Sequence, residues 1–517
     1  MGQIAAAQHL LLCFRAKSCR RTKINKLRRL LTATLSLFLT GAALAGPWVD
    51  AGDERLRSDI QLLADAGVIK GIVTAWPLSW ADVMHDIDTD RDLTPWQSTA
   101  LARVQAAADA AGANGTVRYT GHVSVAHSPV QIRGFADTPR ENAEVAGGIE
   151  YASGRYAARL QATWVSNPDD DKRVRPDGSY ATVSLGNWLL SATAQDQWWG
   201  PGWNSSLIVS SNARPVPSIS LYRNLTTPFE TKWLSWLGHW GLSIQVGQLE
   251  SDRAVPDTVL FKMRLTARPT QNLEFGLSRA AQLCGEGRSC GWDIWRRMLQ
   301  GKDNRDDELS GRDEPGNQLA GFDVRWSSDI RDVPFATYTQ WIGEDEAGGF
   351  PSKWFALFGA ETWGGHDTLG TYRMFFEWSD TMCRFALYKG SENAEPDCTY
   401  NNAVYESGYR YRGRSLGSTF DNDASVYSLG TMLTKDNGNS WLMNIRYGKL
   451  NRKGDPDPGN TVAADKTDYR EVLLTHRRNT RLGEVHLGAS YDSRKNTVTS
   501  EKDDDVRLFL EWRKATR

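Results

Sequence analysis

From about residue 116 onward, apolar and polar positions alternate along short segments of the chain. Leu273, Phe275 and Leu277 alternate with polar or small residues, and this period of two recurs at residues 322–327, 441–448, 484–491 and 506–513. A period of two places successive side chains on opposite faces of a β-strand. The segments are about ten residues long, number roughly 16–18, and often end in Trp or Tyr. The pattern therefore favours a mainly β protein, a transmembrane antiparallel β-barrel, over a soluble β-sandwich.

The polar faces of these segments carry charges of both signs. A barrel would direct into its lumen the side chains of Glu274, Asp323, Arg325, Arg373, Glu377, Arg446, Glu484 and Arg507. Opposite charges in one lumen predict ion-paired networks that fill the interior, although an open solute channel remains the alternative. Highly charged tracts separate the segments, and we expect long solvated outer loops at residues 167–178, 301–316, 451–466 and 492–505.

Residues 53–112 have helical spacing instead. Apolar positions recur every three or four residues along 56–64. A second short helix is predicted after Ser79, with Asp82 completing a capping box, and a third opens with Thr94 before a proline. These three helices predict a small bundle ahead of the barrel.

The amino-terminal region has the three parts of a secretory signal peptide. Eight basic residues precede the apolar stretch 30–44, which ends in Ala43-Leu44-Ala45. We expect cleavage after Ala45. The predicted organisation is thus a signal peptide at 1–45, a periplasmic helical bundle at 46–114 and an outer-membrane β-barrel at 115–517.

Charge and hydropathy exclude other classes of protein. The mean hydropathy of −0.49 argues against a bundle of transmembrane helices. Removal of the signal peptide takes away eight basic residues and no acidic one, so the net charge falls from −1 to −9. An acidic exported chain is a poor candidate for nucleic-acid binding, which needs clustered Lys and Arg.

Four cysteines remain after the signal peptide is removed. In an oxidising compartment an even number predicts disulfides. We favour Cys284–Cys290 and Cys383–Cys398, because each pair closes a short loop, and the two other pairings stay open. No histidine lies at ligand spacing beside these cysteines, so we expect no metal site and no cofactor.

One aromatic loop is the candidate binding segment. Trp198, Trp199 and Trp203 lie among two glycines and a proline, and Asn212 and Arg214 follow a short apolar run. A tryptophan cluster can pack a turn or lie at a membrane interface. It can also stack on sugar rings. We predict these five residues as the polysaccharide-binding set.

Catalytic motifs are weak. Residues 413–417 fit the G-x-S-x-G pattern around Ser415, but a polar run follows where a nucleophile elbow needs a helix. Carboxylate pairs such as Glu344 with Glu346, or Asp421 with Asp423, are expected in solvated loops rather than at a glycosidase site. We expect no enzyme.

Several segments together resemble one known family. They are residues 56–60, 63–69 and 74–79, Gly134-Phe135, Pro139-Arg140, Trp198–Pro201, Ser211–Pro215, Gly247–Glu250, Leu273–Arg279 and Tyr409–Gly417. In order along most of the chain, they resemble the Wzi family of capsule assembly proteins. That resemblance implies an outer-membrane β-barrel with a periplasmic helical bundle, acting as a surface lectin without catalysis. It also implies a structural role for Ser415.

The main hypothesis is therefore a non-enzymatic outer-membrane lectin that anchors capsular polysaccharide or exopolysaccharide at the cell surface. The expected partners are that polysaccharide and outer-membrane lipid, with no nucleic acid, and the chain is expected to be a monomer. A porin or solute channel is the alternative, and a glycan-modifying enzyme is the third hypothesis.

Overall fold

A computed structural model describes residues 48–516 except 89, 113–114, 301–315, 348–349, 367, 385–394, 453–456 and 458. The predicted signal peptide and its cleavage site lie outside the described residues, as does nearly all of the predicted loop 301–316.

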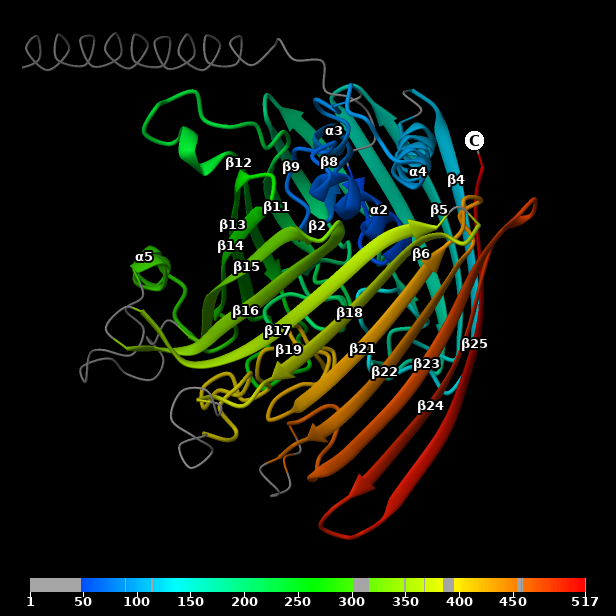
Figure 1. Ribbon diagram of the computed structural model, residues 1–517. Coiled ribbons are helices and arrows are strands. Elements are labelled where there is room, and N and C mark those ends of the chain that lie inside the picture. Colours follow the sequence, from blue (N-terminus) through cyan, green and yellow to red (C-terminus); the bar gives the residue numbers. More distant parts are fainter. Residues whose placement is uncertain are drawn as a thin grey trace, which may run out of the picture.

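The described chain forms a closed antiparallel β-barrel (Figure 1). The wall has 18 strands, a number at the top of the predicted range of 16–18. The two-residue strand β7 pairs with β6 and is not included in this number. The last strand closes the barrel on the first, with Leu510 opposite Val125. The strands are β4 (Val117–His127), β5 (Ala143–Ser153), β6 (Tyr156–Ser166), β7 (Val174–Arg175), β8 (Tyr180–Leu185), β9 (Trp188–Thr193), β11 (Ser218–Arg223), β12 (His239–Gln248), β13 (Val259–Thr270), β14 (Leu273–Leu283), β15 (Gln318–Ile330), β16 (Val333–Ala347), β17 (Phe350–His366), β18 (Gly370–Asp380), β21 (Ser425–Thr434), β22 (Ser440–Leu450), β23 (Thr467–Thr480), β24 (Gly483–Asn496) and β25 (Lys502–Thr516).

The outer face of the wall is apolar. Alternate strand residues such as Leu277, Tyr447 and Leu508 are exposed there, as the period of two predicts. Neighbouring rings form a row around the loop side of the wall, with Trp378 stacked between Phe358 at 5.6 Å and Tyr427 at 6.0 Å. An apolar belt edged by aromatic rings is typical of barrels that span a bilayer.

The two ends of the barrel differ. Short turns join strands at one end, such as β5 to β6 and β23 to β24, while the other end carries long connections, such as β9 to β11 and β18 to β21. We call these the turn end and the loop end. The loop predicted at 492–505 is wrong: β24 and β25 continue through most of it, with Arg494 opposite Asp503. From Lys495 to Asp504 the charged side chains are exposed on both faces, so the strands extend past the apolar belt without alternation.

The helices before the barrel lie at its turn end (Figure 1). They are α2 (Glu54–Asp65), α3 (Trp80–Val83) and α4 (Pro95–Ala111). The capping box at Thr94 is confirmed. The one at Ser79 is wrong, because Ser79 donates to Asn224 and Asp82 accepts from Thr226 instead. A 3-10 helix η1 (Ser235–Leu237) precedes β12, and α5 (Trp292–Gln300) follows β14. None of the described helices is long and apolar enough to cross a bilayer.

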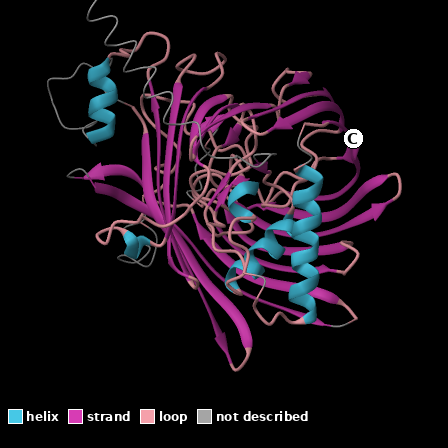
Figure 2. Ribbon diagram, turned by 90° about the horizontal axis from the view of Figure 1, so that it is seen from above, coloured by secondary structure: helices cyan, strands magenta, loops and turns pink. Residues whose placement is uncertain are grey.

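Segments from both ends meet inside the barrel (Figure 2). Three two-stranded sheets form there: β1 (Trp48–Val49) with β3 (Leu78–Ser79), β2 (Ala75–Trp76) with β10 (Trp198–Trp199), and β19 (Arg410–Tyr411) with β20 (Arg414–Ser415). The β2–β10 pair joins the amino-terminal segment to the long connection between β9 and β11, so Trp76 lies opposite Trp198.

Buried ion pairs attach α2 to the inner wall. Arg325 lies 2.6 Å from Asp65 of α2 and 2.7 Å from Glu361 of the wall, and Glu361 also pairs with Arg373 at 2.6 Å. The guanidinium of Arg373 donates to Ser58 of α2 as well. The predicted lumenal network of opposite charges is thus confirmed. Because both ions of each pair are buried, removing one partner would leave an uncompensated charge.

Candidate functional site

The predicted tryptophans lie in the interior of the barrel. Trp198 and Trp199 form strand β10 and are 0% and 1% exposed, and Trp203 is 4% exposed. The indole N–H of Trp198 donates to the Gly202 carbonyl at 2.9 Å, which closes the turn. In the described structure no face of these three rings is open for a sugar, and their stacking role stays a prediction.

Trp203 joins the segments that fill the barrel interior, which we call the plug, to the barrel wall. Its indole N–H donates to Glu361 at 2.8 Å, and its ring stacks on Phe375 of β18 with centroids 5.6 Å apart. The guanidinium of Arg57, from α2, lies 4.1 Å from the ring centroid. Arg57 also donates to the carbonyl of Gly202. Trp203 therefore holds α2, the long connection and the barrel together.

Asn212 and Arg214 lie closer to the loop end. Asn212 is 1% exposed, and its amide donates to the carbonyl of Ser415 at 2.9 Å. Arg214 makes a bidentate contact with Asp177, at 2.7 and 2.8 Å, and also binds Asp170. Both residues line the same recess, which the sequence pattern did not indicate.

Arginines from four different loops meet in this recess, which we call the arginine recess. Its lining contains six arginines and three carboxylates, and Asp137, Asp196 and Asp177 pair with three of these arginines from outside the lining. It is lined by Arg133, Arg140, Glu141, Asp169, Asp170, Arg175, Asn212, Arg214, Arg412 and Arg414.

The contacts inside the arginine recess do not neutralise all of its cations. Asp170 is shared, since it pairs with Arg175 at 2.9 Å, with Arg214, and with Arg412 at 3.7 Å. Arg414 donates to a backbone carbonyl rather than to a carboxylate in the described hydrogen bonds. Arg175 also pairs with Glu141 at 2.5 Å and Arg214 with Asp177. Arg412 and Arg414 are thus the two recess arginines that have no close carboxylate in the described contacts.

The pKa values of the recess arginines differ with their partners, and Asp177 and Asp170 raise the pKa of Arg214 despite its burial. Burial, with Arg140 as the nearest repelling charge, lowers the pKa of Arg133 to about 10. Burial and the same neighbour lower the pKa of Arg414. The pKa of Asp170 is lowered despite its burial, because Arg214 and Arg175 stabilise the carboxylate. Arg412 and Arg414 are the recess cations without a close carboxylate in the described contacts, which favours an anionic ligand such as a uronate, since arginine can bind a carboxylate in a bidentate way.

A larger chamber lies on the lumenal side of the recess. It has a volume of about 760 Å³, and its lining runs from Arg481 and Lys514 at the turn end to Arg140 and Arg175, which also line the recess. The recess itself has only about 30 Å³, close to the room that one water needs. Arg140 pairs there with Asp196 at 3.0 Å. The described residues therefore leave a chamber inside the barrel that narrows sharply at the loop end.

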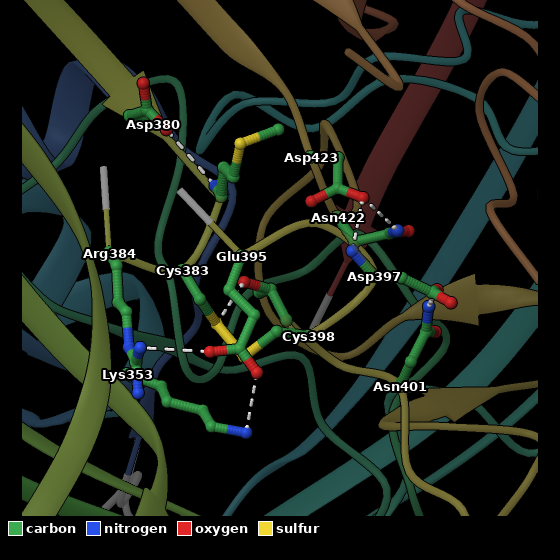
Figure 3. Close-up of a disulfide and its surroundings, with 12 residues drawn as sticks. Lys353, Asp380, Cys383, Arg384, Glu395, Asp397, Cys398, Asn401, Asn422 and Asp423 are labelled. Atoms are coloured by element: carbon green, nitrogen blue, oxygen red, sulfur yellow. Dashed lines mark hydrogen bonds and ion pairs between the residues drawn. A yellow bond between two sulfur atoms is a disulfide. The ribbon is translucent and has the colours of Figure 1, made fainter. Parts of the chain in front are cut away.

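A disulfide fixes part of the loop end (Figure 3). Cys383 is bonded to Cys398, and Cys284 to Cys290, so both predicted pairings are confirmed. Beside the first bond, Glu395 pairs with Lys353 at 2.9 Å. The connection between β18 and β21 is thereby tied to strand β17.

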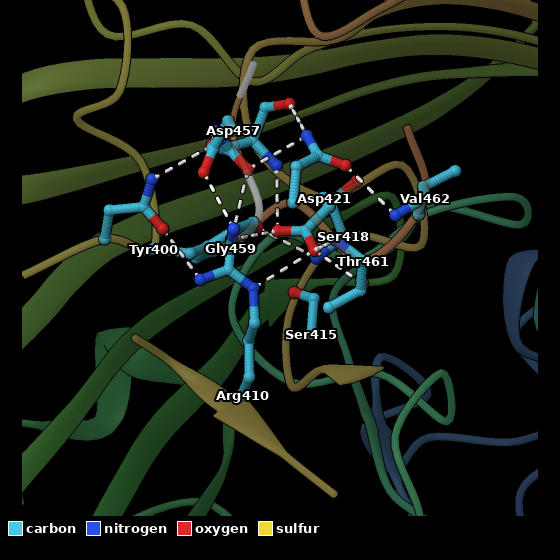
Figure 4. A network of polar contacts seen from close by, with 12 residues as sticks. Tyr400, Arg410, Ser415, Ser418, Asp421, Asp457, Gly459, Thr461 and Val462 are labelled. Atoms are coloured by element: carbon cyan, nitrogen blue, oxygen red, sulfur yellow. Dashed lines mark hydrogen bonds and ion pairs between the residues drawn. The ribbon is translucent and has the colours of Figure 1, made fainter. Parts of the chain in front are cut away.

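A polar network supports the same connection (Figure 4). Arg410 makes a bidentate contact with Asp421 at 2.7 and 3.1 Å, and Thr461 donates to the same carboxylate. These contacts link the β18–β21 and β22–β23 connections. Asp421 and Asp423 are both 0% exposed, so the expectation that they lie in solvated loops is wrong. Arg410 and the Thr461 backbone N–H compensate the charge of Asp421, whereas Asp423 accepts from the Asp397 backbone N–H and from Asn422.

Ser415 is also buried. It lies in β20, and its hydroxyl accepts from the Gly417 backbone N–H at 3.1 Å. Its backbone carbonyl accepts from the side-chain amide of Asn212. In the described residues 408–424 no helix follows it, so the strand–turn–helix context of a nucleophile elbow is missing.

Comparisons with known proteins agree with this architecture. A family model for the capsule assembly protein Wzi matches residues 115–507. The chain belongs to the Wzi family. A solved Wzi family structure from Escherichia coli, described as an outer membrane protein involved in group 1 capsule assembly and a carbohydrate-binding β-barrel, superposes with a TM-score of 0.76 at 25% identity. The alignment covers 92% of this chain and 99% of that one.

A sequence relative points the same way. It is an uncharacterized 55.8 kDa protein from the cps region of Klebsiella pneumoniae, 29% identical over 442 residues, which is 84% of this chain and 83% of the relative. The Wzi resemblance expected from the sequence is thus confirmed.

Proposed function

We propose that this Wzi-family chain is a non-catalytic outer-membrane lectin that retains capsular polysaccharide or exopolysaccharide at the cell surface. In this proposal the loop end faces outward, because bacterial barrels carry short turns in the periplasm and long loops outside. The helices α2–α4 are then periplasmic. The solved Escherichia coli relative is described as a carbohydrate-binding barrel.

The observation that carries the proposal is the arginine recess. It lies at the loop end, it gathers six arginines from loops far apart in sequence, and two of them, Arg412 and Arg414, have no close carboxylate in the described contacts. Packing alone does not require such a cluster, since mutually repelling cations destabilise a fold. An anionic sugar offers what the recess lacks. We therefore propose acidic polysaccharide as the preferred ligand. Because the recess has only about 30 Å³, the sugar ring stays outside it and only the uronate carboxylate contacts the half-buried Arg412 and Arg414.

The test compares a double variant with a matched control. Arg412→Gln with Arg414→Gln removes two recess cations and keeps polar side chains. The control is Arg384→Gln, another loop-end arginine, which lies outside the recess beside Glu395 (Figure 3). Purified protein in detergent is titrated with polygalacturonate and with neutral dextran of matched length.

The wild-type protein and the control should bind polygalacturonate in a salt-sensitive way. The affinity of the double variant should be lower by at least about tenfold, since charge-assisted hydrogen bonds are worth about 1.5–3 kcal/mol each. Equal binding of all three proteins, or preference for dextran, would refute the recess as the binding site.

A further inference from the structure

The short helix α5 lies on the outside of the barrel wall (Figure 1). Its residues Ile294 and Met298 are 2% and 0% exposed, and they pack on Phe261, Ala281 and Leu283. Phe261 is near the loop-end start of β13, and Ala281 and Leu283 end β14. The helix therefore covers the loop-side rim of the apolar belt.

The apolar stripe of α5 extends beyond its contact with the wall. Trp292 is 77% exposed and Leu299 is 50% exposed. Spacings of four and seven residues place Trp292, Arg296 and Leu299 on one side of the helix, and all three are classed as exposed. Asp293, Arg297 and Gln300 make the rest of the helix surface polar, so α5 is amphipathic. The wall covers the edge of the apolar stripe that holds Ile294 and Met298, and the edge with Trp292 and Leu299 lacks a covering among the described residues.

The position of α5 at the rim of the apolar belt indicates that lipid covers its exposed side. The apolar surface continues from the helix onto outward residues of the same sector, such as Leu277 of β14 and Phe322 of β15, which are 50% and 38% exposed. Tryptophan is enriched where acyl chains meet headgroups, and an arginine beside it can extend to a phosphate. The disulfide Cys284–Cys290 joins the end of β14 to the approach to α5, which holds the helix against the wall.

We infer that α5 is a docking site for a phosphate-bearing glycolipid of the outer leaflet. Trp292 and Leu299 contact the acyl chains, and the guanidinium of Arg296 binds a headgroup phosphate. This inference rests on the outward orientation of the loop end in the proposed function, but it concerns lipid rather than polysaccharide. It assigns α5 a role in fixing how deeply, and in which rotation, the barrel is held in the bilayer.

The test is native mass spectrometry of protein extracted in mild detergent and supplied with bisphosphorylated lipid A or with the same lipid after phosphatase treatment. The variants are Arg296→Gln and the pair Trp292→Ala with Leu299→Ala. All three positions are exposed, so the barrel should fold, and its heat-modifiable migration on a gel checks this. Trp233→Ala is the control, since Trp233 is 88% exposed at the turn end.

The wild-type and Trp233→Ala proteins should retain the phosphorylated lipid, and Arg296→Gln should retain it about fivefold less, as expected for about 1 kcal/mol per basic residue at a charged headgroup. The phosphatase-treated lipid should be retained about fivefold less by the wild type as well.

Equal retention by all variants would overturn the inference. A wild-type dimer that the Trp292→Ala and Leu299→Ala pair dissolves, with no change in lipid, would show a second copy of the chain on α5 and would overturn it too. Neither result depends on glycan binding, so a failure here leaves the proposed function to its own test.

Discussion

Replacing Trp203 with alanine should destabilise the barrel rather than selectively remove glycan binding. The side chain is 4% exposed and joins α2, the β9–β11 connection and the wall. Truncating a buried tryptophan costs about 3–5 kcal/mol. The change also removes the donor to Glu361, a bond to a charged group worth about 1.5–3 kcal/mol, so we expect a loss of at least about 4 kcal/mol.

Two further variants separate packing from the indole N–H. Trp203→Phe keeps a ring against Phe375 and Arg57 and loses the donor to Glu361, so its loss should be smaller, about 2 kcal/mol. Trp236→Ala is the matched control, because Trp236 is 64% exposed, and its effect should stay within about 0.5 kcal/mol.

The assay measures the denaturant midpoint of protein folded in lipid vesicles, read from the fraction that keeps the compact gel mobility, alongside polygalacturonate binding of the folded fraction. The folded fraction of Trp203→Phe should bind like wild type. If Trp203→Ala keeps the wild-type midpoint yet loses glycan binding, the buried role is wrong and the tryptophan itself contacts sugar.

Three other changes test the loop end. Arg140→Ala with Asp196→Ala removes the ion pair between the chamber and the arginine recess, so planar bilayers should show steady conductance that the wild type lacks; a wild type that conducts equally would favour the channel alternative. Burial raises the pKa of Asp423 to about 6, above the usual value near 3.9, so the folded state holds the proton more tightly than the unfolded chain and loses stability as the pH rises through about 6. Hydrogen exchange of residues 395–401, corrected for intrinsic rates, should therefore slow from about pH 7.5 to about pH 5, and Asp423→Asn should remove that dependence. Cys383→Ser with Cys398→Ser should cost about 2–4 kcal/mol locally and expose the β18–β21 connection to protease while the strands stay protected, whereas protease resistance equal to wild type would show that the polar network suffices.

Alternation along the strands predicted much of this fold because each wall residue faces either lipid or lumen. Leu277 is outside and Glu274 is inside for that reason, and Glu274 accepts from the backbone of Val73 and Thr74 at the plug. The helix starts after Ser79 and Thr94 are where the sequence predicts them, but the capping contacts were predicted only where the cap is local. Thr94 forms the predicted capping box, but the Asp82 carboxylate accepts from Thr226, a residue 144 positions away.

The site was harder to predict. Nothing local in the sequence shows that the loop of Trp198 and Trp203 folds into the lumen and pairs with Trp76. The arginine recess depends on contacts between Arg175, Arg214 and Arg412, which come from three connections and meet only at Asp170. Such long-range convergence leaves no periodic signal. The amphipathic spacing of α5 is present in the chain, but it covers only nine residues, which is too few for a clear helical period.

The most direct test of the central claim is the partition of polysaccharide between cells and medium. A deletion strain is complemented with the wild-type gene, with the double variant Arg412→Gln and Arg414→Gln, or with Arg384→Gln, at equal levels of folded protein. The account predicts unchanged total polysaccharide in every strain, retention on cells with the wild type and the control, and shedding into the medium with the double variant. Full retention in the deletion strain, or equal retention with all three genes, would contradict it.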